Sequence, residues 1–248
     1  MCRCTIVIGM EVWQSADGIF LGQGKYAVEI LKRFRMMNCM TTPMASNLKL
    51  LSDASSETDD ATMYRQMIGS LMYHMNSRPE IFFAVNTFRH VHMMVTKHAV
   101  RYLKGTVDYG LKYEANQKIN LEGYVDSDWA ASAIDRMSTS GCFFSMVSGV
   151  ISWFSRKQSC VALSIAEAEY VAACSTSCEA VWLRKLLFDL FNLHLDATCI
   201  HCDNQICVKL SENLVFHDKS KHFKIKYHYI RDMVQRGAVK LQYVAMNE

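Results

Sequence analysis

The chain has 248 residues, half of them apolar, with ten cysteines and a formal net charge of +3. This length can bury a full-sized core in one or two domains without disulfides. No stretch has the layout of a secretory signal or the roughly 18 uncharged apolar residues of a membrane span, so we expect a soluble, intracellular chain with reduced thiols.

The first part of the chain, residues 1–113, predicts a small α+β arrangement. β-Branched residues on both sides of residues 17–18 indicate a hairpin. Apolar residues at helical spacing from Lys25 indicate a helix after it. Residues 40–62 are rich in Ser, Thr, Asn and acidic side chains, which predicts a loop. A helix is expected on each side of Pro79, followed by a short helix and a strand.

The pattern changes after a polar linker at 114–120. Residues 121–126 predict a strand that ends in an acid, two more strands follow, and 163–191 predict one long helix. A strand at 198–202, a helix, a basic helix and a last strand complete the chain. Three adjoining strands followed by a helix and by alternating strands and helices predict a mixed α/β sheet with flanking helices over 121–248.

Three carboxylates of this second part lie at positions typical of a metal site. Asp126 ends the first strand, Asp203 follows the strand at 198–202, and Glu169 lies early in the long helix. Ligands gather at the carboxyl ends of strands in open α/β sheets. Three converging carboxylates repel one another unless a cation joins them, and oxygen ligands favour Mg²⁺ or Mn²⁺. Spacing alone leaves open that each acid is a helix cap or a surface residue, with Asp203 as an N-cap.

The stretch ATCIHCDNQICV also permits a zinc interpretation. Cys199 and Cys202, taken with His217 and His222, match a C-x2-C and H-x4-H template. Residues three apart on a strand point to opposite faces, however, and no Gly or Pro turn brings both sulfurs together. We therefore favour the carboxylate interpretation and keep the zinc module as a hypothesis that metal analysis can test.

Positive charge accumulates near the end of the chain. Between His217 and Lys240 there are five Lys and two Arg against two Asp, a local excess of five positive charges. Such a segment suits a polyanion. A solvated helix face would explain the same charges equally well.

Several strings link these features to a known family. The second part contains GYVDSDWA, DRMSTSG, ISWFSRKQ, VALSIAEAEYVAA, EAVWLRKLL, CDNQ and KHFKIKYHYIR. In their order and spacing these strings resemble the ribonuclease H domain of copia-type retrotransposon Pol polyproteins. The first part, with IGMEV, DGIFLGQGKYAVEIL, YRQMIGSLMYHMNSRPEIFFAV and RYLKGTVDYGLKY, resembles the reverse transcriptase downstream of its catalytic motif. The resemblance implies a ribonuclease H-like fold over 121–248, truncated at its C-terminus, and a reverse transcriptase remnant over 1–113.

The resemblance also implies a site and a reaction. Asp126, Glu169 and Asp203 would bind two Mg²⁺ or Mn²⁺ ions and hydrolyse the RNA strand of an RNA/DNA hybrid. One ion would activate a water and the other would stabilise the leaving oxygen, with the ions about 4 Å apart. Asp128 and Glu167 are expected to be structural. The residues expected to contact phosphate oxygens are Lys219, Lys221, Lys226 and Arg231.

Two departures from the family pattern limit the expected activity. The Y-x-D-D motif of the polymerase is absent, so we do not expect DNA synthesis. The family continues past its last strand into a segment A-D-x-L-T-K, whose aspartate would be a fourth carboxylate, whereas this sequence stops at Glu248 before it. A site without that ligand is expected to bind one metal ion more weakly, and its rate of hydrolysis is expected to fall by several orders of magnitude.

The implied partners are an RNA/DNA hybrid and the rest of a Pol polyprotein, namely its reverse transcriptase and integrase, with no membrane. The implied location is a cytoplasmic particle or the nucleus. The alternative function is a non-catalytic nucleic-acid-binding remnant, which would bind hybrids in a salt-dependent way without turnover.

Overall fold

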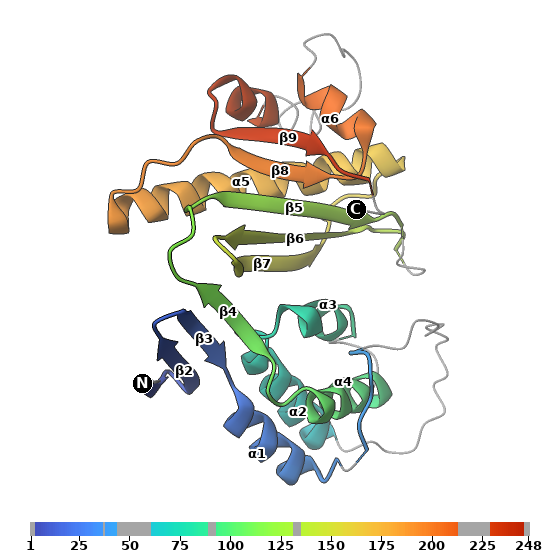
Figure 1. Cartoon of the computed structure of the whole chain (residues 1–248). Helices are drawn as coiled ribbons and strands as arrows, with labels where there is room; N and C mark the ends of the chain where they lie inside the picture. Colours follow the sequence, from blue (N-terminus) through green and yellow to red (C-terminus); the bar gives the residue numbers. More distant parts are fainter. Residues whose placement is uncertain are drawn as a thin grey trace. The chain divides into compact units, whose positions relative to one another are not determined.

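A computed structural model describes residues 3–36, 38–43, 61–88, 93–130, 135–212 and 229–245 of the chain. The chain divides into two compact units, Met1–Ala115 and Asn116–Glu248, whose elements are labelled in Figure 1. Within the described ranges, no helix is both long and apolar enough to cross a membrane.

The first unit contains an antiparallel sheet of four strands in the order β1-β2-β3-β4. Their bounds are Arg3–Val7, Met10–Ser15, Gly18–Gly22 and Gly110–Glu114. The predicted hairpin is formed by β2 and β3, with its turn at 16–17, one residue earlier than predicted. The β-branched run before it is not continuous. Ile8 and Gly9 have φ angles of 51° and 74°, which reverse the chain between β1 and β2.

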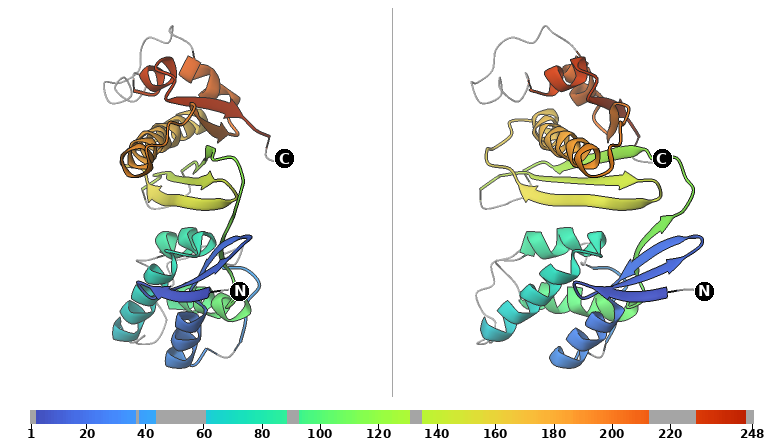
Figure 2. Two further views of the ribbon diagram at one scale, coloured as in Figure 1. Left: turned by 60° about the vertical axis from the view of Figure 1, so that its left-hand side comes forward. Right: turned by 90° about the vertical axis from the view of Figure 1, so that its left-hand side faces the viewer.

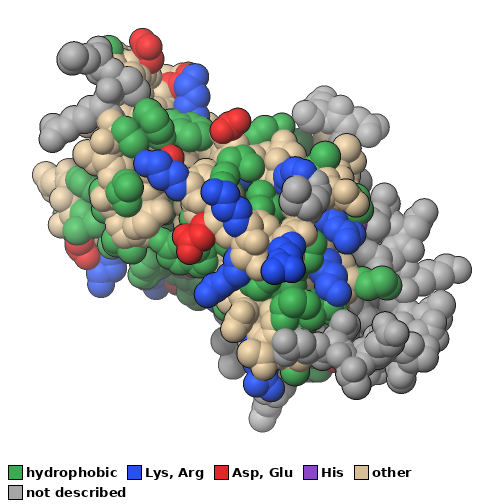
Figure 3. Space-filling model, turned by 90° about the horizontal axis from the view of Figure 1, so that it is seen from below, with side chains coloured by type: hydrophobic (Ala, Val, Ile, Leu, Met, Phe, Trp, Pro, Cys, Tyr) green, Lys and Arg blue, Asp and Glu red, His purple; other side chains and the backbone are tan. Residues whose placement is uncertain are grey.

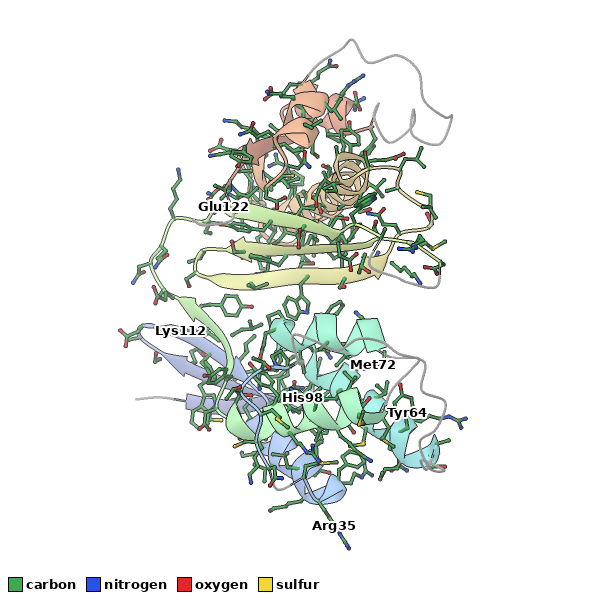
Figure 4. The ribbon with its side chains drawn as sticks, turned by 90° about the vertical axis from the view of Figure 1, so that its right-hand side faces the viewer. Arg35, Tyr64, Met72, His98, Lys112 and Glu122 are labelled. Atoms are coloured by element: carbon green, nitrogen blue, oxygen red, sulfur yellow. The ribbon has the colours of Figure 1, made fainter. Side chains whose placement is uncertain are left out.

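The described part of the first unit also contains four helices: α1 (Gly24–Phe34), α2 (Ala61–His74), α3 (Pro79–Phe88) and α4 (Met93–Gly105). Pro79 is the first residue of α3, where its missing N–H costs no hydrogen bond. The helices enclose a core that includes Met67, Leu71, Ile81 and Leu103, all fully buried. Figure 4 labels two residues of α2, Tyr64 and Met72, and His98 of α4.

One buried histidine in this unit makes its stability depend on pH. His74 is 1% exposed, and neither ring nitrogen has a hydrogen-bond partner within the described ranges. Burial, together with the positive charge of Arg78, lowers the pKa of His74 from 6.5 to about 4. The unfolded chain therefore binds more protons than the folded chain between these two values, and stability decreases as pH falls through this window.

His74→Leu is expected to remove this dependence while filling the space beside Tyr26, whose ring centroid lies 5.2 Å from that of His74. Urea unfolding at a series of pH values measures the difference. Between pH 7 and pH 4 the wild-type free energy of unfolding should fall by about 3 kcal/mol more than that of the variant. If the free energy of unfolding changed with pH in the same way for both proteins, His74 would not be neutral in the folded chain.

The second unit contains a mixed sheet of five strands in the order β7-β6-β5-β8-β9. Their bounds in chain order, from β5 to β9, are Leu121–Asp128, Thr139–Met146, Gly149–Lys157, Thr198–Cys202 and Val239–Tyr243. The first three strands are antiparallel, β8 is parallel to β5, and β9 is parallel to β8. The mixed sheet with flanking helices that the sequence predicts over 121–248 is confirmed.

The long helix α5 (Ile165–Phe191) lies along one face of this sheet, as Figure 2 shows. Its start is fixed by a two-way cap. The Ser164 side chain accepts from the Glu167 N–H at 3.3 Å, and the Glu167 carboxylate accepts from the Leu163 N–H. This start places Glu169 on the buried face of the helix. A shorter helix, α6 (Gln205–Glu212), and a helical segment at 229–235 follow β8.

Candidate metal centre

Strand pairing brings two of the predicted carboxylates together. Val125 of β5 pairs with Cys202 of β8, and the two strands are parallel. The next residue on each strand is an aspartate, so Asp126 and Asp203 lie at the same edge of the sheet. Burial raises the pKa of Asp203, and the negative charge of Asp126 adds to that shift. The two carboxylates are therefore close enough to repel each other.

Glu169 joins them from α5. The Ser127 backbone N–H donates both to Oδ1 of Asp126, at 2.8 Å, and to Oε1 of Glu169, at 3.0 Å. Glu169 is only 3% exposed, and its Oε2 has no hydrogen-bond partner in the described part of the chain. Burial raises the pKa of Glu169 to about 8, and neighbouring negative charges add to the shift. These charges belong to Cys202, Asp203 and Asp126.

A thiol also lies in this cluster. Glu169, Cys202 and Asp203 each offer a ligand atom within 4.8 Å of the other two. A hydrogen bond from the Cys207 thiol lowers the pKa of Cys202. The sequence interpretation considered Cys202 as a strand residue or as a ligand of the zinc template, and it did not place Cys202 beside the carboxylates. Strand alternation could have placed it on the same buried face as Ile200, the face that α5 covers.

The interpretation of Asp203 as a helix cap is wrong. The cap of α6 is Asn204, whose Oδ1 accepts from the N–H groups of Ile206 and Cys207, both at 3.0 Å. Because Asn204 satisfies these N–H groups, the Asp203 carboxylate is not used at the helix start.

The other nearby acids have structural partners. The Asp128 carboxylate accepts from the Thr139 N–H, which ties β5 to β6. Glu167 caps α5, as described above. Glu122, labelled in Figure 4, lies at the start of β5, far along the strand from its carboxyl end, and its Oε2 lies 3.9 Å from Nε2 of His201. The carboxylates of these three acids are therefore engaged by structural partners.

Gln158 positions the site and was missed at the sequence level. Its buried Nε2 donates to Oγ of Ser140 at 2.9 Å, to the Ala168 carbonyl at 2.9 Å and to Oγ of Ser127 at 3.3 Å. These bonds join β5, β6 and the first turns of α5 beside Glu169. Nothing in the string ISWFSRKQ indicates that Gln158 joins β5, β6 and α5.

The two thiols of the zinc template do not face the same side of β8. Cys202 is buried on the α5 side, whereas Sγ of Cys199 lies 3.2 Å from Oε1 of Gln242 on β9. His217 and His222 lie outside the described residues. Cys199 and Cys202, the described half of the zinc template, thus lie on a regular strand with their sulfurs on opposite faces.

The predicted phosphate contacts are largely outside the described ranges, which exclude Lys219, Lys221 and Lys226. Arg231 lies in the helical segment at 229–235, and its Nε donates to the Leu210 carbonyl at 3.3 Å. Figure 3 shows Lys and Arg side chains spread over one face of the molecule among hydrophobic ones. Binding of phosphates by the four residues stays a prediction.

Comparisons with known proteins identify relatives along nearly the whole chain. No family model matches it. The retrovirus-related Pol polyprotein from transposon RE1 of Arabidopsis thaliana is 36% identical over 250 residues, which are 97% of this chain and 17% of that protein. The corresponding polyprotein from transposon TNT 1-94 of Nicotiana tabacum is 35% identical over 260 residues, 98% of this chain and 19% of that protein. The chain thus spans less than a fifth of the length of these relatives.

Among solved structures, LC11-RNase H1, isolated from compost, aligns with a TM-score of 0.39 and 14% identity. The alignment covers 52% of this chain and 86% of that one.

Proposed function

Because the chain belongs to the retrovirus-related Pol polyproteins of transposons, we propose that its second unit is a metal-dependent ribonuclease H that hydrolyses the RNA strand of RNA/DNA hybrids. The placement of the three acids carries this proposal: the Ser127 N–H donates to both Asp126 and Glu169, and Glu169 and Asp203 offer ligand atoms within 4.8 Å of each other. The boundaries we propose are 1–113 for the end of a reverse transcriptase and 121–248 for the ribonuclease H domain.

The three carboxylates fit divalent cations. None of them forms an ion pair with another described residue, and the buried Oε2 of Glu169 lacks a partner within the same ranges. Oxygen donors favour Mg²⁺ or Mn²⁺, and two such ions would more than offset the three negative charges of the cluster. When bound, the ions would activate a water and stabilise the leaving oxygen of the RNA strand.

The chain's own residues supply the geometry. Asp126 offers oxygens from β5 and Asp203 from the residue after β8, and Glu169 offers its oxygens from the helix. The Ser127 N–H orients two of these carboxylates at once. Gln158 holds α5 against the sheet, so that Glu169 stays in line with the strand ends. Such preorganised donors do not have to rearrange when the substrate arrives.

The proposed partners follow from the same assignment. An RNA/DNA hybrid is the substrate, with phosphate contacts from the basic segment that contains Lys219, Lys221, Lys226 and Arg231. The rest of a Pol polyprotein is the proposed molecular context, in a cytoplasmic particle or the nucleus.

Cleavage of matched substrates tests the proposal. The purified chain is incubated with an RNA/DNA hybrid labelled on either strand, and with the same RNA alone, in Mg²⁺ or in a chelator. We expect cleavage only of the RNA strand, only in the hybrid, and only with the metal. Cleavage of free RNA at the same rate would contradict the assignment. Salt-dependent binding of the hybrid without cleavage would support the non-catalytic remnant instead.

A further inference from the structure

Cys202 lies among the carboxylates. Its thiol is 1% exposed at the end of β8, and a ligand atom of each of Glu169, Cys202 and Asp203 lies within 4.8 Å of the other two. We propose that Cys202 joins Glu169 and Asp203 as a ligand for a thiophilic divalent cation, Zn²⁺ or Cd²⁺. The same edge of the sheet would then have a second, softer metal specificity.

A second observation points to a ligand at this place. Glu169 is 97% buried, yet its Oε2 makes no hydrogen bond to any residue that the structure describes. A buried carboxylate oxygen without a partner is costly unless a cation or a proton satisfies it. The carboxylate is held by a single bond from the Ser127 N–H to Oε1, so Oε2 is available to a bound ion.

The donor set determines which ion binds best. Thiolate ligands select zinc and other soft ions, whereas Mg²⁺ requires oxygen donors. One sulfur and two carboxylate oxygens would give Zn²⁺ three protein ligands and leave one position open, an arrangement typical of catalytic rather than structural zinc. The thiophilic ion and the proposed Mg²⁺ would share Glu169 and Asp203, so their binding is mutually exclusive. The inference rests on the proposed function in one respect: both assign a metal ion to Glu169 and Asp203.

This site differs from the zinc template of the sequence. That template requires Cys199, whose sulfur lies on the other face of β8 and contacts Gln242. Cys199 and Cys202 have the same chemistry and lie three residues apart on one strand. They form a matched pair in which only one member faces the carboxylates.

Cadmium and zinc binding to the full chain tests the inference. Cd²⁺ is titrated into metal-free wild type, Cys202→Ser, Cys199→Ser and Glu169→Gln while thiolate-to-cadmium absorption is followed. Zn²⁺ affinity is measured by equilibrium dialysis. Circular dichroism establishes that each variant is folded. Because the thiols other than Cys199 and Cys202 are common to all four proteins, a difference shared by Cys202→Ser and Glu169→Gln but absent from Cys199→Ser reports on this site.

We expect Cys202→Ser to weaken Zn²⁺ binding by about 100-fold or more and to remove one component of the cadmium absorption, with Cys199→Ser unchanged. Glu169→Gln retains every thiol but should lose the same component, which keeps the test decisive if Cys202→Ser does not fold. The inference would be overturned if wild type and Glu169→Gln bound Zn²⁺ equally well. It would also be overturned if Cys199→Ser and Cys202→Ser lost the same amount of Zn²⁺ affinity.

Hybrid cleavage in Mg²⁺, measured on the same wild-type preparation, separates the two proposals. Zinc binding that depends on Cys202 without any cleavage would support this inference and contradict the proposed function. Hybrid cleavage together with zinc binding that does not depend on Cys202 would support the proposed function and contradict this inference.

Discussion

Asp126→Asn is expected to slow cleavage of the RNA strand by at least about a thousandfold, which corresponds to about 4 kcal/mol of lost transition-state stabilisation. Asparagine has nearly the same size and can still accept the Ser127 N–H through its side-chain oxygen. It lacks the negative charge and second anionic oxygen that a divalent cation requires. The loss should therefore appear in metal-dependent turnover and hardly in folding.

Asp128→Asn is the matched control, because the two residues share a residue type, a strand and a strand face. The Asp128 carboxylate accepts from the Thr139 N–H, so we expect its substitution to lower stability and to change the rate by less than about tenfold. Single-turnover cleavage of a hybrid at saturating Mg²⁺ measures both variants. Equal losses of rate would show that Asp126 has no special role.

Glu169→Gln is expected to stabilise the metal-free chain at alkaline pH and to abolish its stabilisation by Mg²⁺. Burial raises the pKa of Glu169 from 4.5 to about 8, so the folded chain binds more protons than the unfolded chain between these values. This contribution to stability is fully present below pH 4.5 and is lost as pH rises through 8. The glutamine does not titrate and keeps its side-chain oxygen for the Ser127 N–H.

Urea unfolding in a chelator, at about pH 5 and about pH 8.5, measures this effect. The two proteins should differ little at the acidic pH, and at the alkaline pH the variant should be more stable by about 2–4 kcal/mol. Added Mg²⁺ should narrow this difference, because only the wild type gains binding free energy, about 2.7 kcal/mol at a hundredfold excess over the dissociation constant. A wild-type curve that Mg²⁺ does not shift would contradict the metal assignment.

The sequence located one strand end of the site, because alternation and chain order are local signals. Asp203 follows β8 as predicted, whereas β5 continues two residues past Asp126, to Asp128. The parallel pairing of β5 with β8, which brings the two aspartates together, is visible only in the structure. Glu169 was singled out as an acid early in the long helix, and the family strings then assigned it to the metal site. The roles of all three in metal binding stay predictions.

Other features depend on tertiary packing that local patterns do not contain. The cap at Asn204 could not be separated from one at Asp203, because both residue types are good caps and the choice depends on where β8 ends. The position of Cys202 beside Glu169 depends on how α5 packs on the sheet. The reversal at Ile8 is equally hidden, because a β-branched residue rarely adopts a positive φ.

A calorimetric titration of Mn²⁺ into the metal-free chain tests the central claim most directly, since it needs neither substrate nor turnover. The wild type is compared with a chain that carries Asp126→Asn, Glu169→Gln and Asp203→Asn together, after circular dichroism has established that both are folded. We predict saturable binding to the wild type that disappears in the triple variant. Binding of equal affinity and stoichiometry to both proteins would contradict a metal centre at this edge of the sheet.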